Sequence, residues 1–305
     1  MSFDQYGLTN DYKQVETRYD ESHEVLWTFM NQRNMIPCFN GEIVNELTHH
    51  HQEIKKTGGL LHFNGNVHNV RYSVAASLTP DVFNLGGQLT LIRELALNRQ
   101  RDALKSYAIK ALDVLATRTF RFNLPTLTTI TLLQGHTLGA GFEAALTSDV
   151  VIAERKTIVG FPEIIFNLFP GMGAYSLVAR KAGPKIADEM IHDGKLYTAE
   201  QAHEMGLVDI LVEDGEGEKA VFTWIEKNKR LSNGYLAIQK AKARFNPVTY
   251  EELVDITHIW LDAALKLTER DFKVMERFIR SQEKLYVKPA EESSVNVVEI
   301  LRSVV

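Results

Sequence analysis

Apolar positions follow two different spacings along the first two thirds of the chain. Short runs rich in β-branched and aromatic residues are typical of strands, and they predict strands at 24–29, 69–77, 126–133, 149–153 and 207–212. Between them, apolar residues recur at helical spacing, which predicts helices at 41–56, 88–120 (with a break near Asn98), 173–182, 184–193 and after the capping box that begins at Thr198. Strands that alternate with helices indicate an α/β fold.

The last third of the chain has a different pattern, because it shows helical spacing without further strands. Residues 214–217 read Asp-Gly-Glu-Gly and predict a hinge. The longest helix is expected at 251–286, where an apolar stripe includes Trp260. We therefore expect four segments: a flexible N-terminus at 1–22, a core at 23–214, a C-terminal helical region at 215–286 that serves as a pocket lid and a subunit contact, and a mobile tail at 287–305.

Composition narrows the function classes. The chain has 305 residues, a net charge of −5 and a pI near 6.1, so no basic excess favours nucleic acid as a partner. Its single cysteine, Cys38, allows neither an intrachain disulfide nor a cysteine metal cluster. No apolar run approaches the roughly 20 residues that span a bilayer, and the N-terminus lacks the pattern of a secretory signal. A cytoplasmic protein without membrane insertion is expected.

Three consecutive histidines, His49 to His51, are the strongest hint of a metal site. Consecutive residues point in different directions around a helix, whereas useful co-ligands are four positions apart. We interpret these histidines as part of a solvated helix face, and we predict no metal and no cofactor.

Two acids, Glu143 and Glu163, stand in mostly apolar neighbourhoods where a buried charge is costly without a partner or a function. Glu143 follows a glycine-rich turn at 134–141, and a second such turn lies at 83–88. Where a strand ends and a helix begins, the first helical turn presents free N–H groups.

The stretch GAGFEA fits the loose dinucleotide pattern GxGxxA, but residues 134–138 separate it from the strand, which argues against nucleotide binding. Considered singly, each acid also fits a structural role at a helix start.

Three blocks in this order resemble the crotonase (enoyl-CoA hydratase/isomerase) superfamily. They are FNLGG at 83–87, GAGFE at 139–143, and FPE at 161–163 followed by FPGMG at 169–173; the later YTAEQAHEMGLVD is also typical. The resemblance implies an α/β fold with a ββα spiral core and a C-terminal all-helical segment. Within the superfamily, VFNLGG, GFEAAL, PEIIFNLFPGMGAYS and the Trp260 helix are most similar to the diffusible signal factor synthases.

The resemblance also implies roles for particular residues. The N–H groups of Leu85 and Ala140 would form an oxyanion hole, and the surrounding glycines would support it: Gly86, Gly87, Gly139 and Gly141. Glu163 would take the C2 proton of a 3-hydroxyacyl thioester, and Glu143 would protonate the departing C3 hydroxyl. The acyl tail would contact Phe166, Leu168, Phe169, Met172 and Trp260. The chain departs from the family at Gln88, where an acid is common, and at Ala140, where glycine is common.

The function implied is synthesis of a cis-2-unsaturated fatty acid signal for quorum sensing. The enzyme would dehydrate a medium-chain 3-hydroxyacyl group on acyl carrier protein and then hydrolyse the thioester, with the glutamate that acts in hydrolysis left open. No GxSxG motif offers a serine nucleophile.

Two alternatives remain: a conventional enoyl-CoA hydratase of fatty acid oxidation, and a crotonase-fold regulator that binds a partner. The resemblance further implies a homotrimer or dimer of trimers, and it allows a sensor kinase as a regulatory partner.

Overall fold

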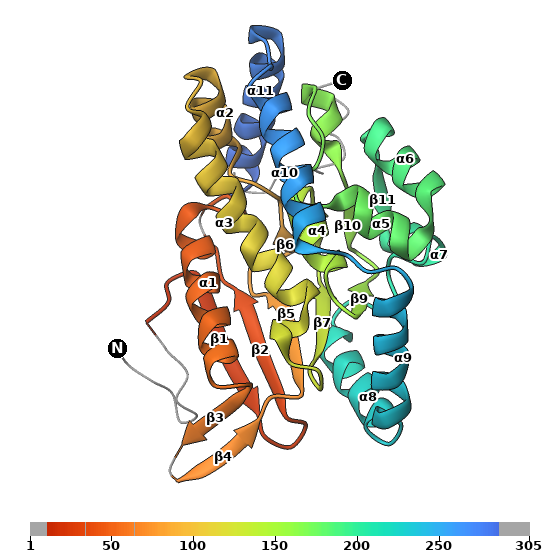
Figure 1. Cartoon of the computed structure of the whole chain (residues 1–305). Helices are drawn as coiled ribbons and strands as arrows, with labels where there is room; N and C mark the ends of the chain where they lie inside the picture. The colour runs from red at the N-terminus through yellow and green to blue at the C-terminus, as the bar shows by residue number, and fades with distance from the viewer. Residues whose placement is uncertain (1–10, 34, 64, 287–305) are drawn as a thin grey trace.

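The computed structural model describes residues 11–33, 35–63 and 65–286 (Figure 1). Six strands form the larger sheet, in the order β1-β2-β5-β7-β9-β12. β1 is antiparallel to β2, and the other neighbours are parallel. The strands are β1 (Val15–Asp20), β2 (Val25–Met30), β5 (Tyr72–Ser77), β7 (Thr128–Leu133), β9 (Val150–Glu154) and β12 (Ile210–Val212).

A second sheet of four strands has the order β11-β10-β8-β6. It consists of β6 (Val82–Asn84), β8 (His136–Leu138), β10 (Ile158–Gly160) and β11 (Leu196–Thr198). Three times in succession the chain passes from a strand of the large sheet to one of the small sheet and then to a helix: β5 to β6, β7 to β8, and β9 to β10. These ββα turns confirm the predicted spiral core. A separate hairpin is formed by β3 (Leu60–Phe63) and β4 (Asn66–Asn69).

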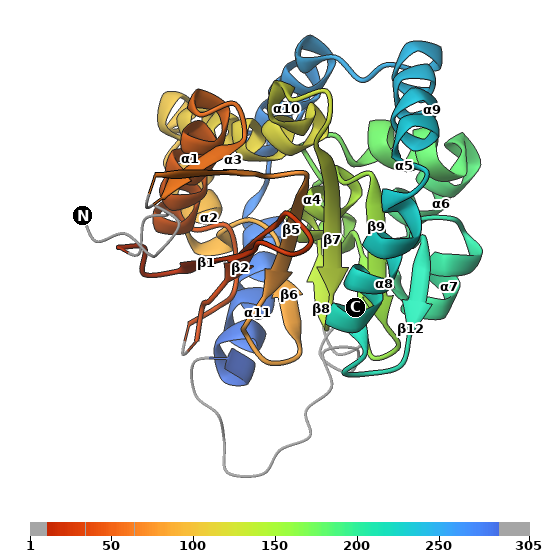
Figure 2. The same ribbon diagram turned by 90° about the horizontal axis from the view of Figure 1, so that it is seen from below.

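Helices cover the spiral and close one side of it (Figures 1 and 2). α10 packs against α3, and α11 packs against α2 and the short helix η2. None of the helices in the described part of the chain is long and apolar enough to cross a membrane. The helices are α1 (Gly41–Lys56), α2 (Leu89–Leu97), α3 (Arg101–Thr119), η1 (Arg121–Asn123), α4 (Ala140–Leu146), η2 (Pro162–Phe166), α5 (Ala174–Ala182), α6 (Pro184–Asp193), α7 (Ala199–Glu204), α8 (Gly217–Lys229), α9 (Ser232–Phe245), α10 (Tyr250–Ala264) and α11 (Glu269–Tyr286).

Signals within one element predicted boundaries well. α1 begins after Asn40, whose side-chain oxygen accepts from the N–H groups of Glu42 and Ile43, and it spans the predicted residues. Thr198 and Gln201 form the predicted capping box of α7. The helix expected at 88–120 is interrupted between Leu97 and Arg101.

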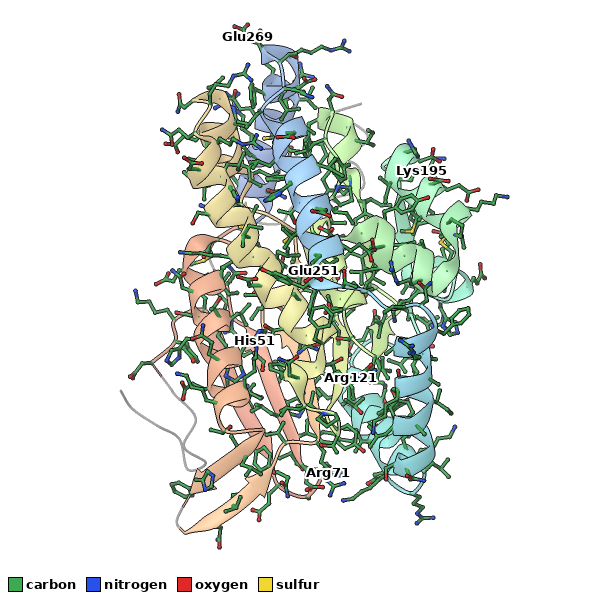
Figure 3. All side chains as sticks on the ribbon, viewed as in Figure 1. His51, Arg71, Arg121, Lys195, Glu251 and Glu269 are labelled. Atoms are coloured by element: carbon green, nitrogen blue, oxygen red, sulfur yellow. The ribbon has the colours of Figure 1, made fainter. Side chains whose placement is uncertain are left out.

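Three expectations about the fold were wrong. The segment 1–22 was expected to be flexible, but β1 lies in it, because its residues pair with β2 and bury Val15 and Tyr19 on one face. The helix expected at 251–286 is two helices, and Figure 3 marks the start of the second at Glu269. Asp271 accepts from the N–H and the hydroxyl of Thr268 and so fixes that new start. The tail expected to be mobile at 287–305 lies outside the described residues.

The third correction concerns the histidines of α1. His50 and His51 are buried rather than part of a solvated face, since α1 lies against α3. The Nε2 of His50 lies 3.0 Å from the Thr28 hydroxyl. Burial lowers the pKa of His50 to about 4, so this ring is neutral near pH 7 and belongs to the core.

Candidate active site

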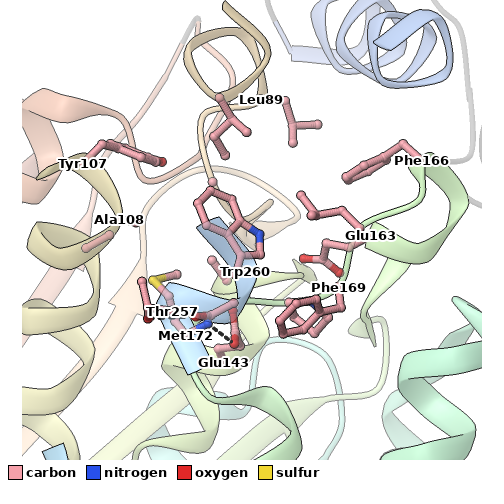
Figure 4. A pocket seen from close by; sticks show the side chains of 17 residues that line it. Leu89, Tyr107, Ala108, Glu143, Glu163, Phe166, Phe169, Met172, Thr257 and Trp260 are labelled. Atoms are coloured by element: carbon pink, nitrogen blue, oxygen red, sulfur yellow. Dashed lines mark hydrogen bonds between the residues drawn. The ribbon is translucent and has the colours of Figure 1, made fainter. Parts of the chain in front are cut away.

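One cavity contains both predicted glutamates (Figure 4). Helices α2 and α3 form one part of its wall, the loop after η2 forms another, and α10 contributes Thr257 and Trp260. All five residues predicted to contact an acyl tail line it: Phe166, Leu168, Phe169, Met172 and Trp260. Further apolar side chains complete the wall: Leu89, Ile92, Ala108, Ala111 and Pro170.

Glu143 is held in place by backbone donors. It lies on the short helix α4 and is only 1% exposed. Its Oε1 accepts from the N–H of Met172 over 2.7 Å and from the N–H of Ala174 over 2.9 Å. Ala174 opens α5, so its N–H would otherwise lack a partner within the helix. Burial raises the pKa of Glu143 to about 7, while the two N–H donors oppose that rise by stabilising the charged form.

Glu163 has different surroundings. It follows Pro162 at the start of η2, and its Oε2 is shielded from solvent without a hydrogen-bond partner among the described residues. Gly139 has φ of +52°, and any side chain there would collide with Oε1 of Glu163. Burial, with a further contribution from the nearby charge of Glu143, raises the pKa of Glu163 to about 8. Glu163 is therefore the more readily protonated acid.

The first glycine-rich turn does not use Leu85 as predicted. The Leu85 N–H donates to the carbonyl of Pro37 over 2.8 Å, and Leu85 does not line the cavity. Gly86 then turns the chain with φ of +98°, which favours glycine. The next residue, Gly87, lines the cavity, and its N–H has no partner within the described chain. The expectation for Leu85 was therefore wrong, and Gly87 offers the free donor.

Ala140, from the second turn, is where we expected it. It opens α4, lines the same cavity, and its N–H has no hydrogen-bond partner among residues that the structure describes. The two turns are pressed together, because a Cβ at Gly141 would collide with the Asn84 carbonyl and one at Gly86 would lie 3.2 Å from the Ala140 nitrogen. Glycine at these positions thus brings two unpaired N–H groups to one wall of the cavity.

Known proteins are similar to this chain in sequence and in fold. The model of the enoyl-CoA hydratase/isomerase family matches residues 43–284. The 2,3-dehydroadipyl-CoA hydratase of Escherichia coli K12 is 36% identical over 122 residues, which is 40% of this chain and 46% of that protein. A probable mitochondrial enoyl-CoA hydratase 2 of Arabidopsis thaliana is 30% identical over 177 residues, 57% of this chain and 54% of that protein. The chain thus spans about half the length of both relatives.

Among solved structures, a putative enoyl-CoA hydratase from Streptomyces avermitilis superposes with a TM-score of 0.72. The match covers 97% of this chain and 98% of that one, at 20% sequence identity. At such low identity the likeness shows a shared fold.

Proposed function

The chain belongs to the enoyl-CoA hydratase/isomerase family, and from that premise we propose that it interconverts 3-hydroxyacyl and 2-enoyl thioesters by adding or removing water across C2 and C3. One observation carries the proposal. A buried and a partly buried carboxyl group of unequal pKa share an apolar cavity with two backbone N–H groups that have no partner in the described chain. That set supplies a base, an acid and an oxyanion site, which this reaction needs.

In the hydration direction, the charged Glu143 takes a proton from water as the water oxygen bonds to C3. The C2–C3 π electrons move toward the thioester carbonyl, whose oxygen becomes an enolate. The N–H groups of Gly87 and Ala140 would donate to that oxygen, a form of stabilisation typically worth several kcal/mol. Protonated Glu163 then gives its proton to C2. These are the proton positions that the two environments favour near pH 7.

Dehydration uses the same groups in reverse, with Glu163 charged and Glu143 protonated. Because the pKa of Glu163 is raised further than that of Glu143, moving the shared proton from Glu163 to Glu143 costs free energy. This penalty slows the reaction without preventing it. Both directions are therefore open to the site.

The finer proposal is that the substrate is a medium-chain 3-hydroxyacyl group on acyl carrier protein and that the product leaves as a free cis-2-unsaturated acid. The likeness of VFNLGG, GFEAAL and PEIIFNLFPGMGAYS to signal synthases supports it, as does an apolar cavity covered by α10. In the hydrolytic step, water activated by a carboxylate attacks the thioester carbonyl, and the thiol leaves. The same N–H pair would stabilise the tetrahedral oxyanion.

We also propose a cytoplasmic homotrimer or dimer of trimers with the C-terminal helices at the contacts. On and just before α9, three exposed apolar residues recur at seven-residue spacing: Leu231, Ile238 and Phe245, which are 63%, 56% and 89% exposed. That spacing places them along one side of a helix. Light scattering should show a smaller assembly for Phe245→Asp than for wild type. A sensor kinase as a regulatory partner is a prediction that rests only on the resemblance to the family.

The test is to incubate the protein with 3-hydroxydodecanoyl-acyl carrier protein and, separately, with crotonyl-CoA, and to identify the products by mass spectrometry and NMR. Free cis-2-dodecenoic acid supports the signal-synthase proposal. An intact carrier thioester together with hydrated crotonyl-CoA would instead support a conventional enoyl-CoA hydratase. If the protein transforms neither thioester, or if Glu143→Gln transforms them as fast as wild type does, the acid–base proposal is wrong.

A further inference from the structure

Thr257 lies on helix α10, and its hydroxyl bonds to the loop whose backbone donates to Glu143. It is 1% exposed and lines the cavity. Its hydroxyl oxygen lies 2.9 Å from the carbonyl oxygen of Gly171 and 3.0 Å from that of Leu253. The Leu253 contact is the ordinary bond of a helical threonine to the carbonyl four residues earlier. The Gly171 contact, in contrast, reaches out of the helix to a loop distant in sequence.

The acceptor of that bond belongs to the peptide group that binds Glu143. The carbonyl of Gly171 and the N–H of Met172 form one planar amide. Its oxygen accepts from Thr257, whose single hydroxyl hydrogen is shared with the Leu253 carbonyl, and its N–H donates to Oε1 of Glu143 over 2.7 Å. Hydrogen bonds in such a chain polarise one another, so a donor at the carbonyl strengthens the N–H as a donor. Trp260 packs directly on Gly171, where any side chain would collide with the indole, and so restrains the same amide.

We propose that Thr257 is a positioning residue, which fixes and polarises the Gly171–Met172 amide so that Glu143 is kept charged and aimed into the cavity. The proposal deepens the function above and rests on it for its catalytic meaning. It explains why α10 contributes a polar side chain to an otherwise apolar part of the wall. The helix covers the cavity and also contributes to the electrostatics of the base.

Few ionisable side chains share the cavity with Glu143 and could shift its titration. Among the described residues, the ionisable side chains that line the cavity with Glu143 are Glu163 from η2 and Tyr107 from α3. The Tyr107 hydroxyl is already engaged, since it accepts from the Gln88 N–H and donates to the Phe39 carbonyl. Glu163 is therefore the group to neutralise before Glu143 is titrated.

The experiment is an infrared titration of the Glu143 carboxyl in a Glu163→Gln background, with the Glu143→Gln, Glu163→Gln double variant subtracted. Thr257→Val keeps the shape of the side chain but removes the hydroxyl, and we expect it to raise the titration midpoint by roughly half to one pKa unit. Thr257→Ser, which keeps the hydroxyl, should restore the original midpoint. If the valine variant does not fold, Thr257→Ala makes the same comparison with serine.

Thr119→Val is the matched control, because within the described residues the Thr119 hydroxyl bonds only to the carbonyl four residues earlier, that of Leu115. An unchanged midpoint in Thr257→Val, or an equal shift in Thr257→Ser, would overturn the proposal. The titration does not require turnover, so an inactive wild type would contradict the proposed function and leave this result standing. With an active wild type, Thr257→Val should lower kcat several-fold and leave KM within about twofold, a pattern expected for a group that acts in the transition state.

Discussion

Glu143 and Glu163 are identical side chains in very different surroundings. The backbone of residues 171–174 lies against Glu143, and the turn at Gly139 lies against Glu163. At residues 171–174, the backbone offers two N–H groups to Glu143. At Gly139, the backbone approaches Glu163 closely, and Oε2 of this acid has no hydrogen-bond partner in the described chain. Glu143 is buried, and Glu163 is partly buried with its Oε2 shielded from water, yet only Glu143 has donors that favour its charge.

The comparison shows how one cavity can hold an acid and a base of the same chemical type. Burial raises both pKa values, and backbone donors then keep that of Glu143 below that of Glu163. A pair of titratable groups with separated pKa values is the usual arrangement for acid–base catalysis. Substitutions that alter the surroundings or the identity of one acid at a time therefore test this difference.

The largest effect is expected from removing either carboxyl. Glu143→Gln and Glu163→Gln should each lower kcat by about 10²–10⁴-fold, because an amide neither accepts nor donates the proton that the reaction moves. Rates of crotonyl-CoA hydration by the purified variants provide the measurement. Glu154→Gln is the matched control, since Glu154 is 1% exposed and bonds to Gln134 and Gly217 away from the cavity. Activity within tenfold of wild type in either cavity variant would contradict the assignment.

A smaller but still large effect is expected from Gly139→Ala. The added methyl would displace the Glu163 carboxyl, so kcat should fall by roughly 10²-fold, as for a misplaced catalytic group. Gly183→Ala separates this effect from backbone strain, because Gly183 also has positive φ, +96°, but has open space around its Cα. Both variants should lose thermal stability. Only Gly139→Ala should lose activity, and equal activity losses would refute the contact.

The pH dependence of hydration should be bell-shaped. The reaction needs one proton on the pair, so kcat/KM should rise as pH passes about 7 and fall as it passes about 8. Dehydration should give the same bell, since it uses the same total protonation state. Initial rates from pH 5 to 10 in both directions test this. A rate that keeps rising to pH 10 would show that no protonated carboxyl is needed.

The smallest effect concerns stability. The pKa of Glu163 is raised from 4.5 to about 8, so the folded state binds more protons than the unfolded state between these values, and its stabilising contribution is lost as pH rises. Glu163→Gln removes this penalty. Its Tm relative to wild type should therefore increase by several degrees between pH 5 and pH 9, measured by calorimetry. A pH-independent difference in Tm would mean that Glu163 titrates alike in both states.

The sequence predicted features whose cause is local and missed those that depend on distant partners. Asn40 identified the start of α1 because a cap acts within one helical turn. The prediction that Leu85 contributes to the oxyanion hole was wrong because its N–H donates to the carbonyl of Pro37, a residue far away along the chain. The break before α11 did have a local signal, Thr268 followed three residues later by Asp271, which the apolar stripe of 251–286 concealed.

For the site, both acids and the apolar residues that line the cavity with them could be predicted, since the apolar context of Glu143 and Glu163 is visible in the sequence. Their unequal environments could not. The N–H donors of Met172, in the loop before α5, and of Ala174, the first residue of α5, lie about thirty residues after Glu143 and reach it only through the packing of α5 on α4. The role of Thr257 likewise depends on how α10 folds back over the cavity.

The most direct test of the division between the two acids is hydrogen exchange at C2 of a saturated thioester, dodecanoyl-CoA, which has no hydroxyl to lose. In deuterated water near pH 8, where Glu163 is partly charged, wild type should exchange the C2 proton through the enolate, as followed by NMR. Glu143→Gln should retain exchange, because no group acts at C3, whereas Glu163→Gln should abolish it. Exchange that survives in Glu163→Gln and disappears in Glu143→Gln would contradict the account.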